Sequence, residues 1–285
     1  MKIQVIIPVY KPDDKFSRLL NMLKKQTVAF DLLIIDSGSD GVYRKELSGL
    51  DARVEIINKK DFNHGGTRQW GIDISPDKDI YVFLTQDAVP ADEYTIKNLV
   101  DVFSDDRIGC AYGRQLPHPE SGPFGTHARL FNYPAKSYKR SMADASKYGM
   151  KTVFISDSFA AYRSTAVKDA GGFPSDVIMS EDMYFATKML QKGWQIAYSA
   201  EAQVYHSHDY TIMQEYKRYY DIGVFHGKEA WIRETFGAAE GEGGRFVKSE
   251  IKYLLKHNLF RLPEMFIRDA MKWLGYRRGI MSVKK

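Results

Sequence analysis

Two carboxylates follow short apolar runs, at points where buried strands are expected to end. Asp87 comes after the run 80–84, and Asp36 comes after the run 32–35. A buried carboxylate is costly unless it is paired, hydrated or bound to a cation, and its oxygens suit Mg²⁺ or Mn²⁺ shared with substrate phosphates. Asp36 could also accept hydrogen bonds from a nucleobase or a ribose. Both residues could instead serve local structure, Asp87 by capping a helix and Asp36 by closing a tight turn.

A pair of histidines with two-residue spacing gives a candidate metal-binding element. His206 and His208 lie on a segment that is expected to be extended, so their side chains point the same way. Neutral imidazole is a common metal ligand, and Asp209 adds a carboxylate next to them. A purely structural role for these histidines is equally open on the sequence alone.

An acidic pair at the start of a helix gives a candidate general base. Ser180 is expected to cap a helix over 180–191, with Glu181 and Asp182 in its first turn. Acidic residues in a first turn stabilise a helix through its dipole without any further role. The alternative is that one carboxylate accepts a proton during catalysis, and the same dipole would then keep it ionised at neutral pH.

Two glycines at another helix start give a weak candidate for anion binding. Gly65 and Gly66 precede a helix that is expected over 67–74, and backbone N–H groups at such a start can bind phosphate. Arg68 in the first turn could reach a phosphate or a base edge. The spacing of a P-loop is missing, so a plain loop-to-helix turn is the simpler interpretation.

These candidates are spaced along an alternation of strand and helix signals. Apolar runs rich in Ile and Val predict buried strands, and the segments between them show helical periodicity. The expected strands are 3–9, 32–35, 54–57, 80–84, 108–112, 152–156 and 195–198, and the expected helices are 14–26, 67–74, 92–103 and 180–191. This rhythm predicts an open, mostly parallel, doubly wound α/β sheet. Such sheets bind ligands at the carboxyl ends of their strands, where the polar candidates are found.

Two segments break this pattern. Residues 115–150 hold four of the ten prolines and several aromatics, and they are expected to form an irregular segment, either an acceptor-binding loop or a mobile surface insertion. From Met213 onward the sequence has helical character. Within that region, four glycines in 237–244 predict a hinge or loop.

The composition indicates a folded protein of a reducing compartment. Hydrophobic residues make up 44% and charged residues 27% of the 285 residues, which excludes disordered and low-complexity classes. No apolar run approaches the roughly 20 residues of a membrane span, and the N-terminus is typical of a strand rather than a signal peptide. Cys110 is the single cysteine. We expect Cys110 to be packed in the core and the protein to be cytoplasmic.

The net charge of +5 comes from the C-terminal end. Residues 245–285 hold 11 Lys and Arg residues against three acidic residues. Two helices with apolar and basic stripes are expected before and after Pro263, and basic amphipathic helices are typical of membrane-surface elements. The stripes could instead pack on the protein's own core or on a second subunit, which would give a homodimer. Nucleic-acid binding is not expected, because no binding motif accompanies the charge.

The motifs in their order resemble the inverting family 2 glycosyltransferases with the GT-A fold. The resemblance rests on IIPVYKP, LIIDSGSDG and LTQDA, on Ser-Glu-Asp at a helix start and on Lys192-Gly193-Trp194 beyond it. Within the family, FNHGGTRQ, LTQDA and SEDM are most similar to bacterial polysaccharide rhamnosyltransferases, which use dTDP-β-L-rhamnose. The implied catalytic domain spans 1–210, with a nucleotide-sugar-binding half over 1–114 and an acceptor-side half over 115–210. Residues 211–285 are then a basic helical region.

The resemblance also implies a role for each matching residue. Asp182 is the counterpart of the catalytic base, with Glu181 beside it, and Asp87 is the counterpart of the last carboxylate in the family's metal-binding Asp-x-Asp. His206 or His208 stands where some relatives supply a further metal contact. The implied nucleotide-sugar site comprises Pro8, Val9, Tyr10, Asp36, Ser37, Arg68, Gln86 and Asp87.

The implied reaction is a single in-line displacement at the anomeric carbon, with inversion. Asp182 would take a proton from an acceptor hydroxyl, while Mn²⁺ or Mg²⁺ and Arg68 stabilise the departing diphosphate. We expect the acceptor to be a bacterial surface polysaccharide, lipid-linked at the inner face of the plasma membrane. Thr85 replaces the first acidic residue of Asp-x-Asp, which puts metal dependence in question. A different donor, such as a UDP-hexose, and a non-catalytic sugar-nucleotide-binding protein stay as alternatives.

Overall fold

The computed structural model describes residues 1–237 and 240–283, and within these ranges a nine-stranded mixed sheet forms the centre of the N-terminal part. The strands are β1 (Ile3–Val9), β2 (Asp31–Asp36), β3 (Ala52–Ile56), β4 (Ile80–Leu84), β5 (Val89–Pro90), β6 (Ile108–Leu116), β7 (Tyr138–Arg140), β8 (Phe159–Arg163) and β9 (Gln195–Tyr205). Their order is β3-β2-β1-β4-β8-β6-β9-β5, with β7 paired to β9. The first four strands of this order are parallel. Their carboxyl ends therefore meet at one edge, as the predicted α/β class requires.

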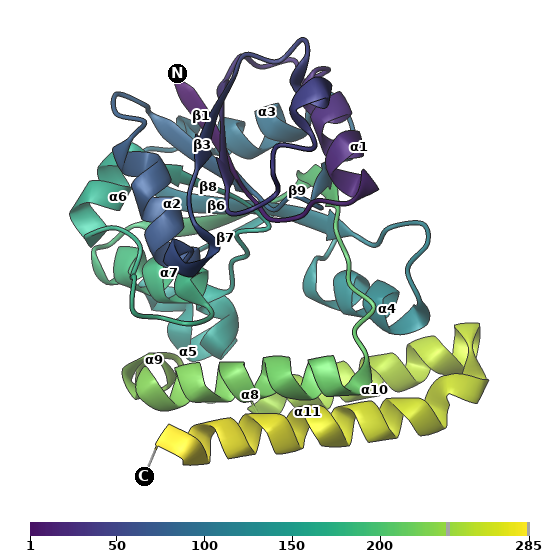
Figure 1. The fold of residues 1–285 in the computed structure, drawn as a ribbon. Helices are drawn as coiled ribbons and strands as arrows, with labels where there is room; N and C mark the ends of the chain where they lie inside the picture. Colours follow the sequence, from purple (N-terminus) through teal and green to yellow (C-terminus); the bar gives the residue numbers. More distant parts are fainter. Residues whose placement is uncertain (238–239, 284–285) are drawn as a thin grey trace.

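Helices cover both faces of the sheet (Figure 1). They are α1 (Asp14–Leu23), α2 (His64–Asp73), α3 (Thr95–Val100), α4 (Pro123–Asn132), α5 (Ala145–Tyr148), α6 (Ser164–Ala170) and α7 (Glu181–Gln191). Because strand side chains alternate between faces, β1 sends Val5 and Ile7 toward α1 and α3, and Ile6 toward α2, α6 and α7. Cys110 is fully buried in the core that contains Ile6, on the side of α2, α6 and α7, which confirms its predicted packing.

The strand expected over 152–156 is wrong. Gly149–Val153 is a 3-10 helix, and the strand that follows is β8, which lies between β4 and β6 and is antiparallel to both. Val153 and Ile155 are buried outside the sheet, so their apolar pattern resembled that of a strand. The antiparallel course of β8 has a consequence for the site: its first residues lie beside the carboxyl end of β4.

The segment 115–150 is more regular than expected. β6 continues into this segment as far as Leu116, and the segment then forms α4, β7 and α5. The later strand β9 also extends beyond its predicted end. Pro123 stands in the first turn of α4, where a missing N–H costs nothing, so this proline begins a helix instead of breaking one.

In the described part of the chain, four α-helices follow the last strand. They are α8 (Ile212–Lys228), α9 (Ala230–Phe236), α10 (Glu240–His257) and α11 (Leu262–Val283), and α8 lies alongside α11 (Figure 1). The loop predicted over 237–244 is helical from residue 240, and residues 238 and 239 lie outside the described residues. Across the described ranges, each helix is too short or too polar to cross a membrane.

α8 and α11 approach each other at a distance that only glycine allows. A Cβ added to Gly279 of α11 would lie 2.1 Å from the Tyr220 carbonyl oxygen of α8. A Cβ added to Gly223 of α8 would lie 2.3 Å from the Tyr276 carbonyl oxygen of α11. Glycines on both helices therefore allow the close contact of this helix pair.

Replacement of Gly279 by alanine should destabilise the protein. The added Cβ would overlap the backbone of α8, and overpacking costs about 1–3 kcal/mol. Gly244→Ala in α10 is the matched control, because nothing lies within 4 Å of its added Cβ and alanine is the better helix former by roughly 1 kcal/mol. Urea unfolding should show a lower free energy of unfolding for Gly279→Ala and no decrease for Gly244→Ala. Equal stability of the two variants would contradict the close packing.

Candidate active site

Polar residues from three strand ends meet at the carboxyl edge of the sheet, as predicted. The N–H of Tyr10 donates to the Gln86 side chain (2.8 Å), and the Gln86 amide donates back to the Tyr10 carbonyl (3.1 Å). The Ser37 hydroxyl and N–H both donate to the Val9 carbonyl, at 3.1 and 2.9 Å. Val9 is buried and Pro8 is half-buried, so Tyr10 presents the accessible ring at this edge. Nucleotide binding by these residues stays a prediction.

Asp36 closes the turn after β2. Its Oδ1 accepts from the N–H groups of Gly38 (3.0 Å) and Ser39 (2.8 Å), and its Oδ2 accepts from the hydroxyl of Tyr43 (2.8 Å). Burial raises the pKa of Asp36, but these hydrogen bonds together outweigh burial and lower the pKa below its ordinary value. The structure thus shows the turn role, and the implied contact to a base stays a prediction.

Asp87, His206 and His208 form a compact group at the same edge. Nε2 of His206 lies 3.5 Å from Oδ1 of Asp87, and Nε2 of His208 lies 3.7 Å from Oδ2. One ligand atom from each residue fits within a span of 4.8 Å, which suits a single metal ion. Burial lowers the pKa of both imidazoles, which favours the neutral form that binds metals. The structure therefore brings the three predicted metal ligands together.

Gln115 fixes which nitrogen of His206 faces Asp87. Its Oε1 lies 2.8 Å from Nδ1 of His206 and also accepts from Arg129, while its Nε2 donates to the Ser156 hydroxyl (3.0 Å). An amide oxygen can only accept, so Nδ1 carries the proton and Nε2 keeps its lone pair on the side of Asp87. This tautomer is the one that a metal ion at Asp87 requires.

Thr85 stands in the place of an acidic residue but does not join this group. Its N–H donates to the Ser158 carbonyl (3.2 Å), and its hydroxyl is buried without a hydrogen-bond partner among the described residues. This backbone hydrogen bond links the residue after β4 to the residue before β8. The candidate metal group therefore offers one carboxylate and two imidazoles.

Arg68 is buried between two carboxylates. Its Nε lies 3.1 Å from Oδ2 of Asp157, and its Nη1 donates to Oε1 of Glu181 at 2.7 Å. All three residues are at most 7% exposed. This position does not fit the predicted contact of Arg68 with a diphosphate, because its charge is directed inward. The same ion pair occupies Glu181, which therefore does not fit the role of a free base.

The glycine pair before Arg68 lies in the first turn of α2, and part of that turn is capped by Asn63. Oδ1 of Asn63 accepts from the N–H of Gly66 (2.8 Å), and the Asn63 carbonyl accepts from the N–H of Thr67 (2.8 Å). Gly65 is required for packing, since a Cβ there would lie 1.9 Å from the Pro174 carbonyl oxygen. These contacts fit the plain loop-to-helix interpretation, and anion binding at this helix start stays a prediction.

Asp182 forms no ion pair with any described residue. Its Oδ2 accepts from the N–H of Asp157 (3.3 Å), and its Oδ1 accepts from the N–H of Met183 (2.7 Å). Burial, followed by the charges of Glu181 and Asp157, raises the pKa of Asp182 to about 8. The prediction that the helix dipole keeps this carboxyl ionised at neutral pH is therefore wrong. Burial and two neighbouring carboxylates outweigh the dipole of α7.

Ser180 forms a strained turn before this acidic pair. Its φ is 64°, in the left-handed region, and its side chain makes no capping hydrogen bond to α7. The predicted cap position is confirmed, but the predicted side-chain cap is wrong. Strain of this kind persists only where the surrounding structure holds it in place.

Asp157 and Gln115 are the members of this arrangement that sequence reasoning missed. Asp157 stands between an apolar run and β8, the same kind of place that singled out Asp87, but the wrong strand over 152–156 obscured it. Gln115 carries no such signal, because an amide in a strand has no distinct chemistry until its partner His206 is known.

Sequence comparison identifies the family. The profile of "Glycosyl transferase family 2" matches residues 4–171, and the chain belongs to this family. The O-antigen chain rhamnosyltransferase RfbN of Salmonella typhimurium is 48% identical over 281 residues, which cover 98% of this chain and 90% of that protein. The O-antigen chain rhamnosyltransferase WbaN of Salmonella anatum is 42% identical over 277 residues, which cover 96% and 88%. The chain is a glycosyltransferase, as predicted.

Solved structures share the fold. The mannosyltransferase PcManGT from Pyrobaculum calidifontis, in complex with GDP-Man and Mn²⁺, matches with a TM-score of 0.64 at 16% identity, covering 99% of this chain and 88% of that chain. The 1–349 fragment of S. aureus TarS matches with a TM-score of 0.57 at 15% identity, covering 100% and 91%. These similarities confirm the predicted GT-A-type fold.

Asp182 should lower the stability of the free protein as the pH rises. An unfolded Asp has a pKa of about 3.9, whereas burial raises the pKa of Asp182 to about 8, so folding loses stability as the pH rises between these values. Asp182→Asn keeps the side chain neutral. At alkaline pH the variant should therefore have a free energy of unfolding higher than that of wild type by roughly 1 kcal/mol or more. This difference between variant and wild type should shrink as the pH falls toward about 4.

Denaturant unfolding over this pH range measures the difference. The exposed Asp51→Asn variant is the matched control and should show no such trend. A difference between wild type and Asp182→Asn that stays constant with pH would contradict the raised pKa.

Proposed function

We propose that the protein is an inverting rhamnosyltransferase that transfers L-rhamnose from dTDP-β-L-rhamnose to a hydroxyl of a bacterial cell-surface polysaccharide. The observation that carries this proposal is the 48% identity to an O-antigen chain rhamnosyltransferase across 98% of the chain. A second rhamnosyltransferase at 42% identity supports the same sugar. The site supports the chemistry, because Asp182 is a carboxylate that forms no ion pair with a described residue and accepts only from backbone N–H groups.

The proposed cofactor is one divalent cation, Mn²⁺ or Mg²⁺, held by Asp87, His206 and His208. The donor set fits, since one carboxylate oxygen and two imidazole nitrogens lie within reach of a single ion. Imidazole ligands favour Mn²⁺ over Mg²⁺, which prefers oxygen, and PcManGT of the same fold was solved with Mn²⁺. When bound, the cation would neutralise charge on the departing diphosphate.

The proposed reaction is a single displacement. Asp182 takes the proton of the acceptor hydroxyl while that oxygen bonds to the anomeric carbon, and the bond from this carbon to the diphosphate breaks with its electron pair on the diphosphate. Inversion of the β-linked donor gives an α-linked product. A double displacement would need a free carboxylate nucleophile, and the neighbours Glu181 and Asp157 are both held by Arg68.

Arg68 takes a positioning role in this proposal. Its two carboxylate partners lie next to Asp182 and raise the pKa of that residue. A base with a pKa of about 8 removes protons more readily once it is ionised, although much of it is protonated at neutral pH. At neutral pH fewer molecules therefore carry an ionised Asp182, but each ionised Asp182 is a stronger base.

The proposed acceptor is a lipid-linked glycan, which the enzyme reaches from the cytoplasm at the inner face of the plasma membrane. Both rhamnosyltransferases act on an O-antigen chain by name. The basic C-terminal helices support a peripheral location, because they carry cations toward a surface that is rich in anionic lipids.

Calorimetric titration with dTDP, UDP and GDP, each with and without Mn²⁺, tests the donor without an acceptor. Wild type should bind dTDP most tightly, and Mn²⁺ should strengthen that binding. Asp182→Asn should keep this affinity but lose rhamnosyl turnover by about 10²–10⁴-fold, the usual contribution of a general base.

Each other result has a definite meaning. Preference for UDP would replace rhamnose by a hexose as the donor sugar. Nucleotide binding without turnover in the wild type would favour a non-catalytic binding protein. Retained turnover in Asp182→Asn would refute the assignment of the base.

Gln115→Leu should weaken Mn²⁺ binding about 10–100-fold, because His206 loses the acceptor that fixes its tautomer. Gln115→Glu is the matched control, since a carboxylate still accepts from Nδ1. The electron paramagnetic resonance of free Mn²⁺ measures the affinity without any turnover. Equal affinity of wild type and Gln115→Leu would contradict the role of Gln115, and unchanged affinity in His206→Ala would refute the metal site itself.

A further inference from the structure

Helix α11 directs two of its cations inward and several of its large apolar side chains outward. The side that faces α8 carries Arg268 and Lys272, whose side chains are 12% and 10% exposed. Phe266, Ile267 and Trp273 are 58%, 55% and 64% exposed. The interpretation in which the apolar stripe of this helix packs on the protein's own core is therefore wrong for Phe266 and Ile267.

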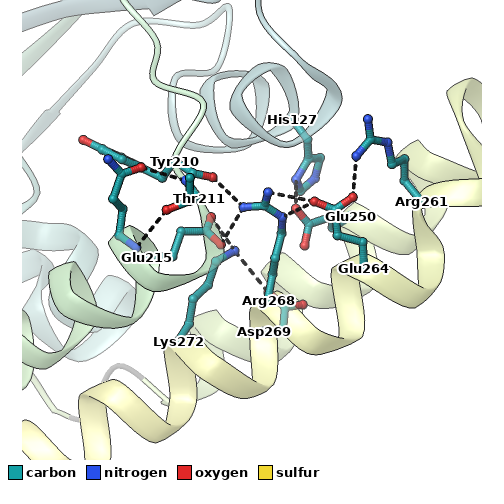
Figure 2. A network of polar contacts seen from close by, with 11 residues as sticks. His127, Tyr210, Thr211, Glu215, Glu250, Arg261, Glu264, Arg268, Asp269 and Lys272 are labelled. Carbon is teal, nitrogen blue, oxygen red and sulfur yellow. Dashed lines mark hydrogen bonds and ion pairs between the residues drawn. The ribbon is translucent and has the colours of Figure 1, made fainter.

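An ion-pair network holds the cations inside (Figure 2). Arg268 pairs with Glu264 at 2.7 Å and with Glu215 of α8 at 3.0 Å. Lys272 lies 3.2 Å from Asp269 and 3.6 Å from Glu215. Rotation of α11 about its axis would break these pairs and leave Glu215 unpaired inside the protein, which is strongly unfavourable. The network therefore fixes the apolar side of α11 toward the outside.

The exposed apolar residues continue into the turn before α11. We call this surface the apolar face; it comprises Leu255, Leu259, Phe260, Phe266, Ile267, Trp273 and Met281, each at least 53% exposed. Phe266 and Trp273 are seven residues apart, so they lie on one side of the helix. Several large apolar side chains exposed on one helix and on the segment before it indicate an interaction site rather than an ordinary surface.

The exposed charges of the described residues 251–283 outside the ion-pair network are positive. Within the described residues 251–283, Glu264 and Asp269 are the acidic side chains, and both belong to the network. The exposed cations include Lys252, Lys256, Arg277 and Arg278. An apolar face with a cationic border is complementary to a bilayer that contains anionic lipids, and a tryptophan suits the membrane–water interface. A second copy of the chain would instead bring cations against cations.

We propose that the apolar face inserts into the surface of an anionic lipid bilayer and docks the enzyme there. α11 then lies in the plane of the interface, in keeping with its inability to span a membrane. The inference gives a physical basis to the membrane location in the proposed function. It does not depend on the donor sugar, because none of these residues belongs to the active site.

Co-sedimentation of the full chain with lipid vesicles tests the docking. Wild type should bind vesicles of phosphatidylcholine and phosphatidylglycerol at least about tenfold more tightly than pure phosphatidylcholine vesicles. The triple variant Phe266→Ser, Ile267→Ser, Trp273→Ser should lose at least about tenfold in this affinity. Val42→Ser with Ile56→Ser is the matched control, because these residues are 69% and 67% exposed on another part of the protein.

The triple variant should keep the nucleotide binding and thermal unfolding of wild type, which separates lost docking from lost folding. Undiminished vesicle binding by the triple variant, or equal affinity of wild type for both lipid mixtures, would overturn the proposal. So would absence of vesicle binding together with a dimer that the triple variant abolishes in sedimentation velocity, since that result assigns the face to a second copy. Vesicle binding without turnover of dTDP-β-L-rhamnose would support the docking and count against the proposed donor alone.

Discussion

The buried guanidinium of Arg68 is the interaction on which the active site depends. It holds Asp157 at 3.1 Å and Glu181 at 2.7 Å, and it thereby joins α2, α7 and the segment before β8. Loss of one partner from such a buried set would leave an uncompensated charge inside the protein, so each of the three residues depends on the other two. Two carboxylates against one cation leave a negative surplus. That surplus, added to burial, gives the adjacent Asp182 its raised pKa.

The same segment connects the base to the candidate metal group. Ser156 accepts from Gln115, whose oxygen fixes the tautomer of His206, and the next residue, Asp157, pairs with Arg68. The antiparallel β8 makes this possible, because its start lies beside the carboxyl end of β4. A purely parallel sheet would place the start of that strand at the opposite edge. Because β8 is antiparallel, the segment just before it contacts both the candidate metal group, through Ser156, and the surroundings of the base, through Asp157.

The strand ends could be predicted from the sequence because apolar runs followed by polar residues identify them locally. Asp87 was found in this way, whereas His206 and His208 were found from their two-residue spacing on a segment expected to be extended. The direction of Arg68 could not be predicted, since it depends on Asp157 and Glu181, which are distant in the chain. The raised pKa of Asp182 depends on burial that no spacing reveals. The sequence of α11 shows apolar and basic residues, but the distant Glu215 decides that Arg268 and Lys272 face inward.

The pH dependence of kcat/KM for rhamnosyl transfer tests the central claim most directly. This quantity reports the ionisation of the free enzyme, so it should rise with pH and reach half of its limit near the pKa of Asp182, at about 8. Asp157→Asn removes one of the charges that raise this pKa and should move the midpoint to lower pH. A profile that is flat through the neutral range, or a midpoint at the ordinary value of a carboxyl group, would contradict Asp182 with its raised pKa as the base.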